Sequence, residues 1–298
     1  MNIKNFILGF STLVVFSLQG TPLVVNGDFE TGDFTGWTTA SQTAAGSWVV
    51  YSGTKAPISG NTISPHPQGL YAAVADQNNI ASMILYQNIQ LPPGKRYLLS
   101  FEYFYTNFAK FHSPTTLSCK QTPNQQARVD ILSSTVSDPY SVAKSDVLAN
   151  VFNTDADDPN VYGPTTLVYD LTPFAGQTIR LRYACVNTEY FFNVGVDNIR
   201  IDALGPLNPP TNLQGYVITN AYFNDPIYSH FILWTPSTTV DTLLGYRVYS
   251  NDKIVSTIPP QGPYEYENLN CTPNVAVTYK VSAYDAIGES VPVTITLR

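Results

Sequence analysis

The sequence predicts an all-β protein of two domains, and three observations support this fold class. Aromatic residues make up 13% of the chain and charged residues 12%, with 20 Tyr and 22 Pro, a composition that favours β-rich structure. From residue 23 to residue 201, apolar and polar residues alternate in short runs without helical periodicity. A proline-rich stretch at residues 205–210 separates a first β-sandwich, expected at residues 21–203, from a second at residues 204–298.

The first 20 residues have the pattern of a secretory signal. Lys4 lies in a short polar start, and residues 6–18 form an apolar run that is too short to span a bilayer comfortably. We expect cleavage near Gly20 or Thr21. No further stretch of spanning length occurs. The mature chain is therefore expected to lack a membrane span and to be secreted, extracellular or at the cell surface, with the periplasm as an alternative.

Strands are expected in the first domain wherever alternation is regular. In residues 97–106, Leu99 and Phe101 face one way while Glu102 and Phe104 face the other. A long loop is expected at residues 52–69, which are rich in Pro and Gly. The expected strands are residues 47–51, 70–76, 82–91, 97–106, 128–132 and 178–184. One sheet face of each is expected to be exposed, as in antiparallel sandwiches.

Two stretches far apart in the chain carry a family resemblance. Residues 26–37 hold an Asn-Gly-x-Phe-Glu motif that ends in Gly36-Trp37, and residues 194–201 read Val-Gly-Val-Asp-Asn-Ile-Arg-Ile. Together they resemble the opening and closing strands of the galactose-binding-like β-sandwiches, which are jelly rolls, and in particular the carbohydrate-binding modules of xylanases and cellulases. The resemblance implies that the two stretches lie side by side with a structural calcium between them, and that the domain binds carbohydrate.

Glu30 and Asp197 are the candidate metal ligands. Asp197 lies in an apolar strand, where an unpaired carboxylate is costly, and Glu30 could share a hard cation with it. Carboxylates with backbone carbonyls suit Ca²⁺, and no His or Cys is near to suggest zinc. The alternative is that Glu30 pairs with a cation such as Arg200 while Asp197 caps a turn.

Ligand binding is expected on the polar faces of three strands. Aromatic and charged side chains suit sugars, because rings cover the apolar C–H face and charged groups bind vicinal hydroxyls. The alternative is a salt-bridged, solvated sheet face. A second option is a platform of aromatic residues in loops, namely Trp48, Tyr51, Tyr190, Phe191 and Phe192. The predicted ligand-binding residues are Glu102, Phe104, Arg128, Asp130, Arg180 and Arg182.

The second domain resembles a fibronectin type III domain, which has the immunoglobulin-like sandwich. Residues 209–213 open a strand with Pro-Pro-Thr-Asn-Leu, and Trp234 follows where the family has a core tryptophan. The resemblance implies that Leu269 and Tyr279 form a tyrosine corner. It further implies a structural or spacer module.

Three cysteines follow the predicted signal, at Cys119, Cys185 and Cys271. In an oxidising compartment, Cys119 and Cys185 could pair, since both fall in the first domain. The alternative is three free, buried thiols.

Several function classes find no support. A formal net charge of −7 and the absence of a Lys/Arg cluster argue against nucleic acid as a partner. The three histidines are isolated, and the chain lacks His-Glu-x-x-His, Gly-x-Ser-x-Gly and phosphate-loop motifs. We therefore expect no enzyme but an exported protein whose first domain binds a polysaccharide or surface glycan. A structural or adhesive cell-surface protein that contacts other proteins is the alternative, and an unrecognised hydrolase comes third.

Overall fold

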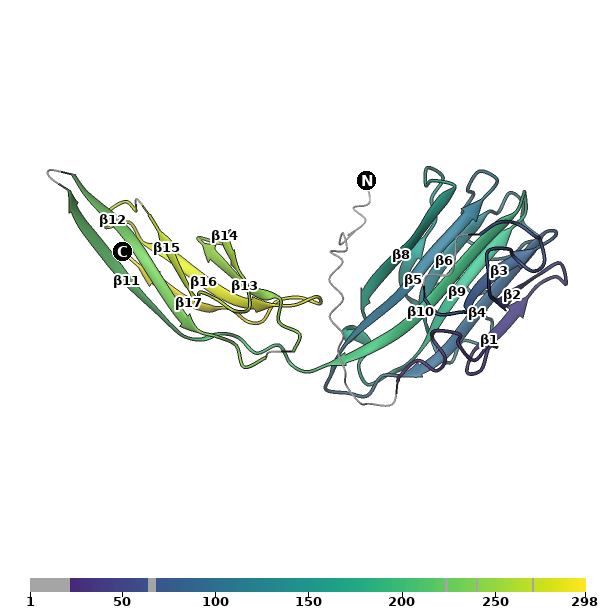
Figure 1. Cartoon of the computed structure of the whole chain (residues 1–298), viewed down its shortest axis with the longest axis horizontal. Helices are drawn as coiled ribbons and strands as arrows, with labels where there is room; N and C mark the ends of the chain where they lie inside the picture. Colours follow the sequence, from purple (N-terminus) through teal and green to yellow (C-terminus); the bar gives the residue numbers. More distant parts are fainter. Residues whose placement is uncertain (1–21, 64–67, 223–224, 240, 270) are drawn as a thin grey trace. The chain divides into compact units, whose positions relative to one another are not determined.

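Figure 1 shows the computed structural model of the chain, which describes residues 22–63, 68–222, 225–239, 241–269 and 271–298. The predicted signal at residues 1–20 lies outside the described residues. The chain divides into two compact units, Met1–Ala203 and Leu204–Arg298. Among the described residues, no helix has the length and apolar character needed to cross a membrane.

The first unit consists of two five-stranded antiparallel sheets. One sheet has the order β1 (Thr38–Ser41), β4 (Ala81–Gln90), β9 (Thr178–Asn187), β6 (Gln126–Ser133), β7 (Val147–Asn153). The other has the order β2 (Gly46–Tyr51), β3 (Ala72–Gln77), β10 (Phe192–Leu204), β5 (Arg96–Asn107), β8 (Val161–Asp170). The short helix η1 (Thr172–Phe174) lies between β8 and β9. The strands expected from alternation correspond to β2, β3, β4, β5, β6 and β9.

The core of the first unit contains alternate residues of the strands in both sheets. Phe101 and Tyr183 make an edge-to-face contact with ring centroids 5.4 Å apart, and Trp48 packs on Tyr183 at 6.5 Å. Burial of each such ring contributes about 1.5–3 kcal/mol, and favourable ring geometry adds to it. This core holds the two sheets together and fixes where their loops emerge.

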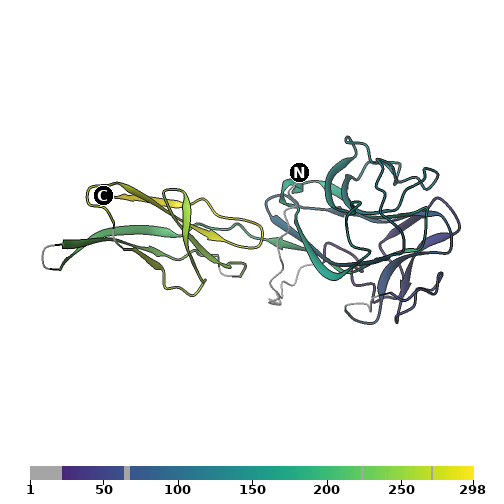
Figure 2. The ribbon, with the colours of Figure 1, turned by 90° about the horizontal axis from the view of Figure 1, so that it is seen from above.

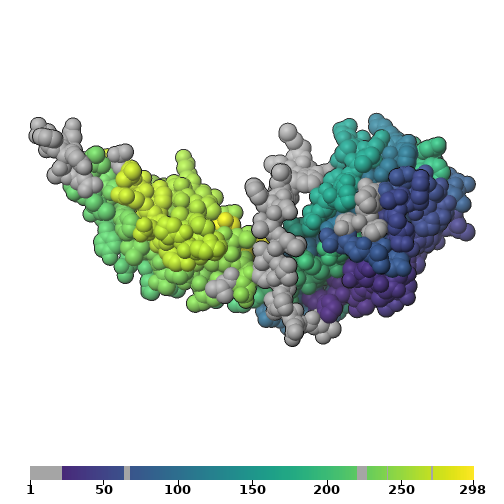
Figure 3. Space-filling model, in the orientation of Figure 1, coloured from purple at the N-terminus to yellow at the C-terminus, as the bar shows by residue number. Residues whose placement is uncertain are grey.

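Loops cover much of the outer face of both sheets, which differs from the expectation of exposed outer faces. Residues 108–125 and 134–146 cover the β4–β9 side, where Leu117 and Tyr140 belong to one apolar cluster with Ile84. The segment after β2 (residues 52–63) covers the other sheet. The buried Asp76 carboxylate holds it there by accepting hydrogen bonds from the backbone N–H groups of Ile58 (2.5 Å) and Ser59 (3.2 Å). The loops flank the sandwich in Figure 2, and the segment after β2, dark blue, lies on the surface in Figure 3.

The two stretches of the first family resemblance lie side by side, as expected. The Ile199 N–H donates to the Gly27 carbonyl at 2.8 Å, and a Cβ on Gly27 would collide with the Ile199 carbonyl oxygen, so this approach requires glycine. Phe29 is fully buried between Phe34 and Trp37, with centroids 6.0 and 5.6 Å away. These contacts attach the start of the first unit to the end of β10.

The second unit consists of a three-stranded and a four-stranded antiparallel sheet. The first has the order β11 (Thr211–Tyr222), β12 (Asp225–Thr235), β15 (Glu265–Asn268), and the second has the order β14 (Lys253–Ile258), β13 (Gly245–Ser250), β16 (Val277–Tyr284), β17 (Val293–Leu297). Trp234 lies in the core of this unit beside Tyr246, as the sequence predicts.

The expected tyrosine corner is formed differently. Tyr279 is fully buried, but its hydroxyl contacts side chains, accepting from Asn268 Nδ2 at 2.7 Å and lying 3.0 Å from His230 Nδ1. Leu269 is 62% exposed and does not belong to the core. The buried hydroxyl still needs a polar partner, and His230 and Asn268 supply it in place of the backbone.

The disulfide considered for Cys119 and Cys185 is absent, and all three cysteines are free. Cys185 points into the core between the sheets, whereas Cys119 packs with the loops on the outer face of the same sheet. Because the sheet lies between the two side chains, their sulfur atoms cannot approach bonding distance.

Candidate functional site

The six predicted ligand-binding residues do not share one surface. Glu102 and Phe104 lie on β5, whereas Arg128 and Asp130 lie on β6 and Arg180 and Arg182 lie on β9. Strands β6 and β9 are neighbours, but β5 belongs to the other sheet. The six residues could form a single polar surface only if all three strands were neighbours, and β5 does not meet this condition.

Arg182 and Asp130 form a buried ion pair beneath a loop. Arg182 Nη2 lies 2.5 Å from Asp130 Oδ2, and both side chains are fully buried. Arg182 Nη1 also donates to the carbonyls of Pro139 (2.9 Å) and Ser141 (2.7 Å). Burial by itself would raise the pKa of Asp130, but the charges and hydrogen bonds of Arg182 and Arg128 together outweigh burial and keep this pKa below its usual value. These contacts hold the loop of residues 134–146 on the sheet.

Arg128 and Arg180 complete the same attachment. Arg128 Nη2 lies 2.9 Å from Asp130 Oδ1. Arg180 donates to the carbonyls of Val136 (2.7 Å) and Ser134 (3.2 Å) and stacks on Tyr86 with its guanidinium carbon 4.3 Å from the ring centroid. The donors of Arg180 and Arg182 thus bind the protein's own carbonyls, and these side chains present no open polar face.

Phe104 and Glu102 lie on the outer face of the other sheet. Phe104 is buried over Gly195 of β10, and a Cβ at Gly195 would collide with its ring. Glu102 is half-buried, and its Oε1 accepts from Gln68 Nε2 at 3.3 Å. Burial raises the pKa of Glu102, and the Gln68 hydrogen bond opposes this rise.

Glu30, Glu102 and Asp197 form an acidic cluster at this face. Asp197 is fully buried, and its Oδ1 accepts from the Asn198 N–H at 2.6 Å, while its Oδ2 has no hydrogen-bond partner among the described residues. Burial, with a smaller contribution from the nearby charges of Glu102 and Glu30, raises the pKa of Asp197 to about 7, against hydrogen bonds from the backbone of Asn198 and Gln68. A buried carboxylate oxygen without a protein partner needs another explanation, such as a bound water or ion or a protonated carboxyl group.

The cluster could hold a cation only with help from the backbone. Within the described residues, no three His, Cys, Asp or Glu side chains converge on one point as metal ligands. Glu30 Oε1 already accepts from the N–H groups of Leu70 (2.7 Å) and Tyr71 (3.0 Å), which fixes its position. Arg200, the cation expected as an alternative partner of Glu30, has its Nε 3.6 Å from Asp202 Oδ2 and donates a hydrogen bond to the Ser100 hydroxyl. The residues therefore fit a hard cation bound by two carboxylates, carbonyl oxygens and water.

A second candidate site consists of aromatic rings on two loops, defined here as the loop-end platform of Phe108, Tyr190 and Phe191. Phe108 and Tyr190 are the most exposed aromatic side chains among the described residues of the first unit, at 48% and 58%. Their ring centroids are 6.4 Å apart, and Tyr190 lies 5.3 Å from Phe191. Of the other predicted loop aromatics, Trp48 and Phe192 are buried in the core and Tyr51 is buried under the segment after β2.

Phe108 was missed at the sequence level. It follows β5 directly, so it reads as a continuation of the aromatic residues of that strand. Its N–H donates to the Phe191 carbonyl at 3.0 Å, and this bond joins the two loops. An apolar residue just past the predicted end of a strand was the available signal.

Gln125 forms hydrogen bonds to both loops of the platform. It is fully buried, and its Nε2 donates to the Tyr190 carbonyl (2.9 Å) and to Asn107 Oδ1 (2.8 Å), while its Oε1 accepts from the Thr188 N–H (3.1 Å). Beside the rings, His112 Nε2 lies 3.5 Å from Glu189 Oε1, each side chain being about one third exposed. The platform thus combines fixed apolar rings with accessible polar groups.

Comparisons with known proteins give structural likenesses only. No protein-family model matches the chain, and no curated protein matches it. A family 61 carbohydrate-binding module, solved with β-1,4-galactotriose, is 15% identical over 62% of this chain and 99% of its own, with a TM-score of 0.35. The K3 adhesin domain of Lys-gingipain from Porphyromonas gingivalis is 18% identical over 60% of this chain and 98% of its own, with a TM-score of 0.38.

A longer likeness covers both units. The tandem of two family 22 carbohydrate-binding modules from Paenibacillus barcinonensis Xyn10C is 8% identical over 94% of this chain and 90% of its own, with a TM-score of 0.37. At these identities and TM-scores, the likenesses do not assign the chain to a family.

Proposed function

We propose that the first unit binds carbohydrate, in a polysaccharide or surface glycan, at the loop-end platform. The observation that carries this proposal is that its two most exposed described aromatic rings, Phe108 and Tyr190, lie together although they come from different loops. Sugar rings bind to such surfaces because their apolar C–H face stacks on aromatic rings while their hydroxyl groups remain free to hydrogen-bond.

The surroundings of the rings support the same ligand class. His112 and Glu189 are partly exposed and can exchange hydrogen bonds with hydroxyl groups, which a purely apolar ligand would not use. The Gln125 hydrogen bonds fix both loops before a ligand arrives, so little conformational entropy is lost on binding.

The proposal includes a structural calcium ion held by Glu30 and Asp197. Its support is the partnerless Asp197 Oδ2 at a buried position, together with the second carboxylate of Glu30 fixed by the Leu70 and Tyr71 N–H groups. A bound Ca²⁺ would supply charge compensation and join the start of the unit to β10.

The remaining parts of the proposal concern export and organisation. The sequence pattern of residues 1–20 supports export to the outside of the cell or to its surface. We assign no catalytic activity, and we take the second unit as a fibronectin type III-like spacer, for which Trp234 in the core is the support. The alternative function, adhesion through contacts with other proteins, is favoured by the exposed apolar residues of β11.

The test is a glycan-array assay on the chain from Thr21, with β-1,4-galactotriose among the probes, followed by calorimetry on any sugar that binds. Phe108→Ala and Tyr190→Ala are each expected to weaken binding by roughly tenfold, about 1.4 kcal/mol, through loss of one stacked ring. Ile254→Ala is the control, because Ile254 is similarly exposed at 54% but belongs to the second unit, away from β11.

Two outcomes would count against the proposal. A folded protein that binds no glycan would favour the adhesive alternative. Binding that survives both ring substitutions would place the sugar elsewhere on the first unit, and Glu102→Gln would then test the face around the acidic cluster.

A further inference from the structure

The hairpin of β11 and β12 extends beyond the third strand of its sheet. β12 pairs with β11 from Asp225 to Thr235, but it pairs with β15 only from His230 to Leu233. Figures 1 and 2 show this hairpin, in green, reaching past the other strands of the second unit. Its outer part is therefore a two-stranded ribbon, an arrangement of marginal stability in water unless further strands or packing support it.

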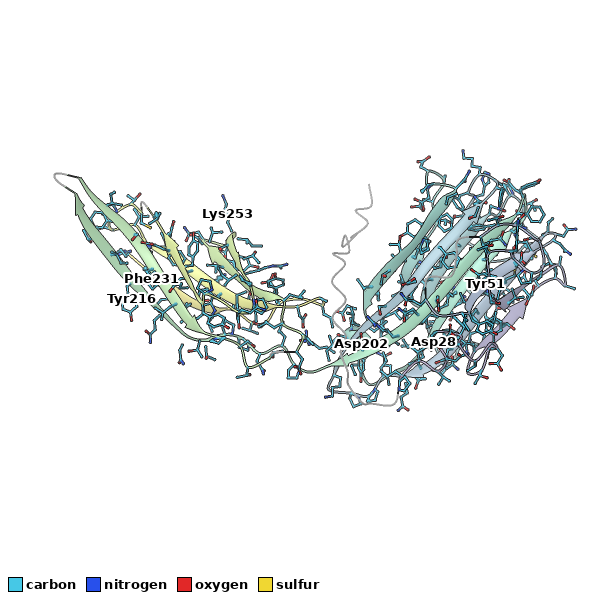
Figure 4. The ribbon with its side chains drawn as sticks, in the orientation of Figure 1. Asp28, Tyr51, Asp202, Tyr216, Phe231 and Lys253 are labelled. Carbon is cyan, nitrogen blue, oxygen red and sulfur yellow. The ribbon has the colours of Figure 1, made fainter. Side chains whose placement is uncertain are left out.

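The hairpin of β11 and β12 exposes apolar side chains on both of its faces, in its three-stranded part as well as in the outer ribbon. Tyr216 and Val217, which are consecutive and so point to opposite faces, are 52% and 44% exposed, and Ile227 is 40% exposed. Tyr216 is paired with Phe231 across the two strands, and Figure 4 shows the two side chains close together. Contiguous exposed apolar side chains are a common feature of interaction surfaces.

Strand β11 also lacks the features that normally protect an edge. Within the described strands it pairs with β12 alone, and its 12 residues include no charged residue and no proline. From Gln214 to Tyr222 its pairing has no register shift. The other edge strands carry a charge (β14, β15), a proline (β8) or register shifts (β7), or have six residues or fewer (β1, β2, β17). An open edge of this length is a template for a further strand.

We propose that β11 pairs antiparallel with β11 of a second copy of this chain, so that the two three-stranded sheets join across a two-fold axis. An extended, uncharged strand with apolar side chains on both faces would complement this edge, and β11 itself has these properties. Pairing centred near Val217 sets Tyr216 beside Ile218 of the second copy, an aromatic and β-branched pair that stabilises antiparallel sheets. The chain carries a net charge of −7, but β11 contains no charged residue, so pairing of two β11 strands brings no like charges together. The two-fold contact closes, so it gives a dimer and not a fibre.

The test is sedimentation velocity on the chain from Thr21 over a wide concentration range, combined with amide hydrogen exchange. The parent protein is expected to show a concentration-dependent dimer. Tyr216→Lys is expected to weaken it by roughly tenfold or more, because lysine at an edge strand opposes pairing. Ile254→Lys is the matched control, since Ile254 is 54% exposed on β14, an edge strand of the other sheet, and its dimer should persist.

Hydrogen exchange separates edge pairing from other contacts. Amides of residues 214–222 should exchange more slowly in the dimer than in the Tyr216→Lys monomer, because pairing gives the outward N–H groups a partner. A parent that remains monomeric at all concentrations overturns the proposal. A dimer without protection of β11, or one unaffected by Tyr216→Lys, overturns it as well and indicates that this edge takes a segment of a different protein or remains open.

Discussion

Calcium should stabilise the first unit through Asp197, and the size of the effect follows from the burial of that residue. Burial raises the pKa of Asp197 from 3.8 to about 7, so keeping the carboxylate ionised above neutral pH costs on the order of 4 kcal/mol without a counter-ion. A divalent ion at Oδ2 would offset most of this cost. For a unit of this size that corresponds to a rise in Tm of roughly 10 °C.

Differential scanning calorimetry in calcium and in chelator measures this effect. The parent is expected to melt higher in calcium. Asp197→Asn removes the charge with little change in shape, so this variant should not respond to calcium and should melt at or above the parent in chelator. Asp202→Asn is the matched control on the same strand, because Asp202 is partly exposed and paired with Arg200, and the calcium response should remain.

If the parent melts at the same temperature in calcium and in chelator, no structural calcium exists at this site. If Asp197→Asn keeps the full response, the ion binds at other residues and the partnerless Oδ2 has a different explanation.

Two further predictions concern buried charged and titratable groups. Asp130→Asn should lower the free energy of unfolding of the first unit by about 3–5 kcal/mol, because it leaves Arg182 buried without a counter-charge. In denaturant titrations, Asp252→Asn at an exposed ion pair should lower the free energy of unfolding by less than about 1 kcal/mol. Equal losses for the two variants would contradict a buried, paired Asp130. Burial lowers the pKa of His230, so the second unit should lose stability as pH falls below about 6.5, where the unfolded chain takes up a proton first. A flat stability between pH 7 and pH 5, measured by Trp234 fluorescence in a variant with Trp37→Phe and Trp48→Phe, would be inconsistent with a buried neutral imidazole.

The contact between the first and last stretches of the first unit could be predicted, because the sequence imposes a steric requirement there. Gly27 and the apolar residues around Asp197 require close backbone approach and burial, and Gly27 does contact Ile199. Strand β8 was not predicted, because Gly163 and Pro164 interrupt its alternation although it pairs with β5. Sequence patterns report the period of a strand but not which strand it joins, so Glu102 and Arg182 could not be assigned to different sheets.

The location of the candidate site depended on contacts that alternation does not encode. An outward-facing arginine on a strand has the same sequence signature whether its donors meet sugar hydroxyls or the carbonyls of a covering loop. In this protein, Arg180 and Arg182 bond to carbonyls of residues 134–141, so their binding capacity is used inside the molecule. At the loop end the situation is reversed. Gln125 satisfies the backbone of the loops, and the apolar faces of Phe108 and Tyr190 remain in contact with water. Since only the second arrangement leaves free energy to be gained by a ligand, the loop end is the better candidate for binding.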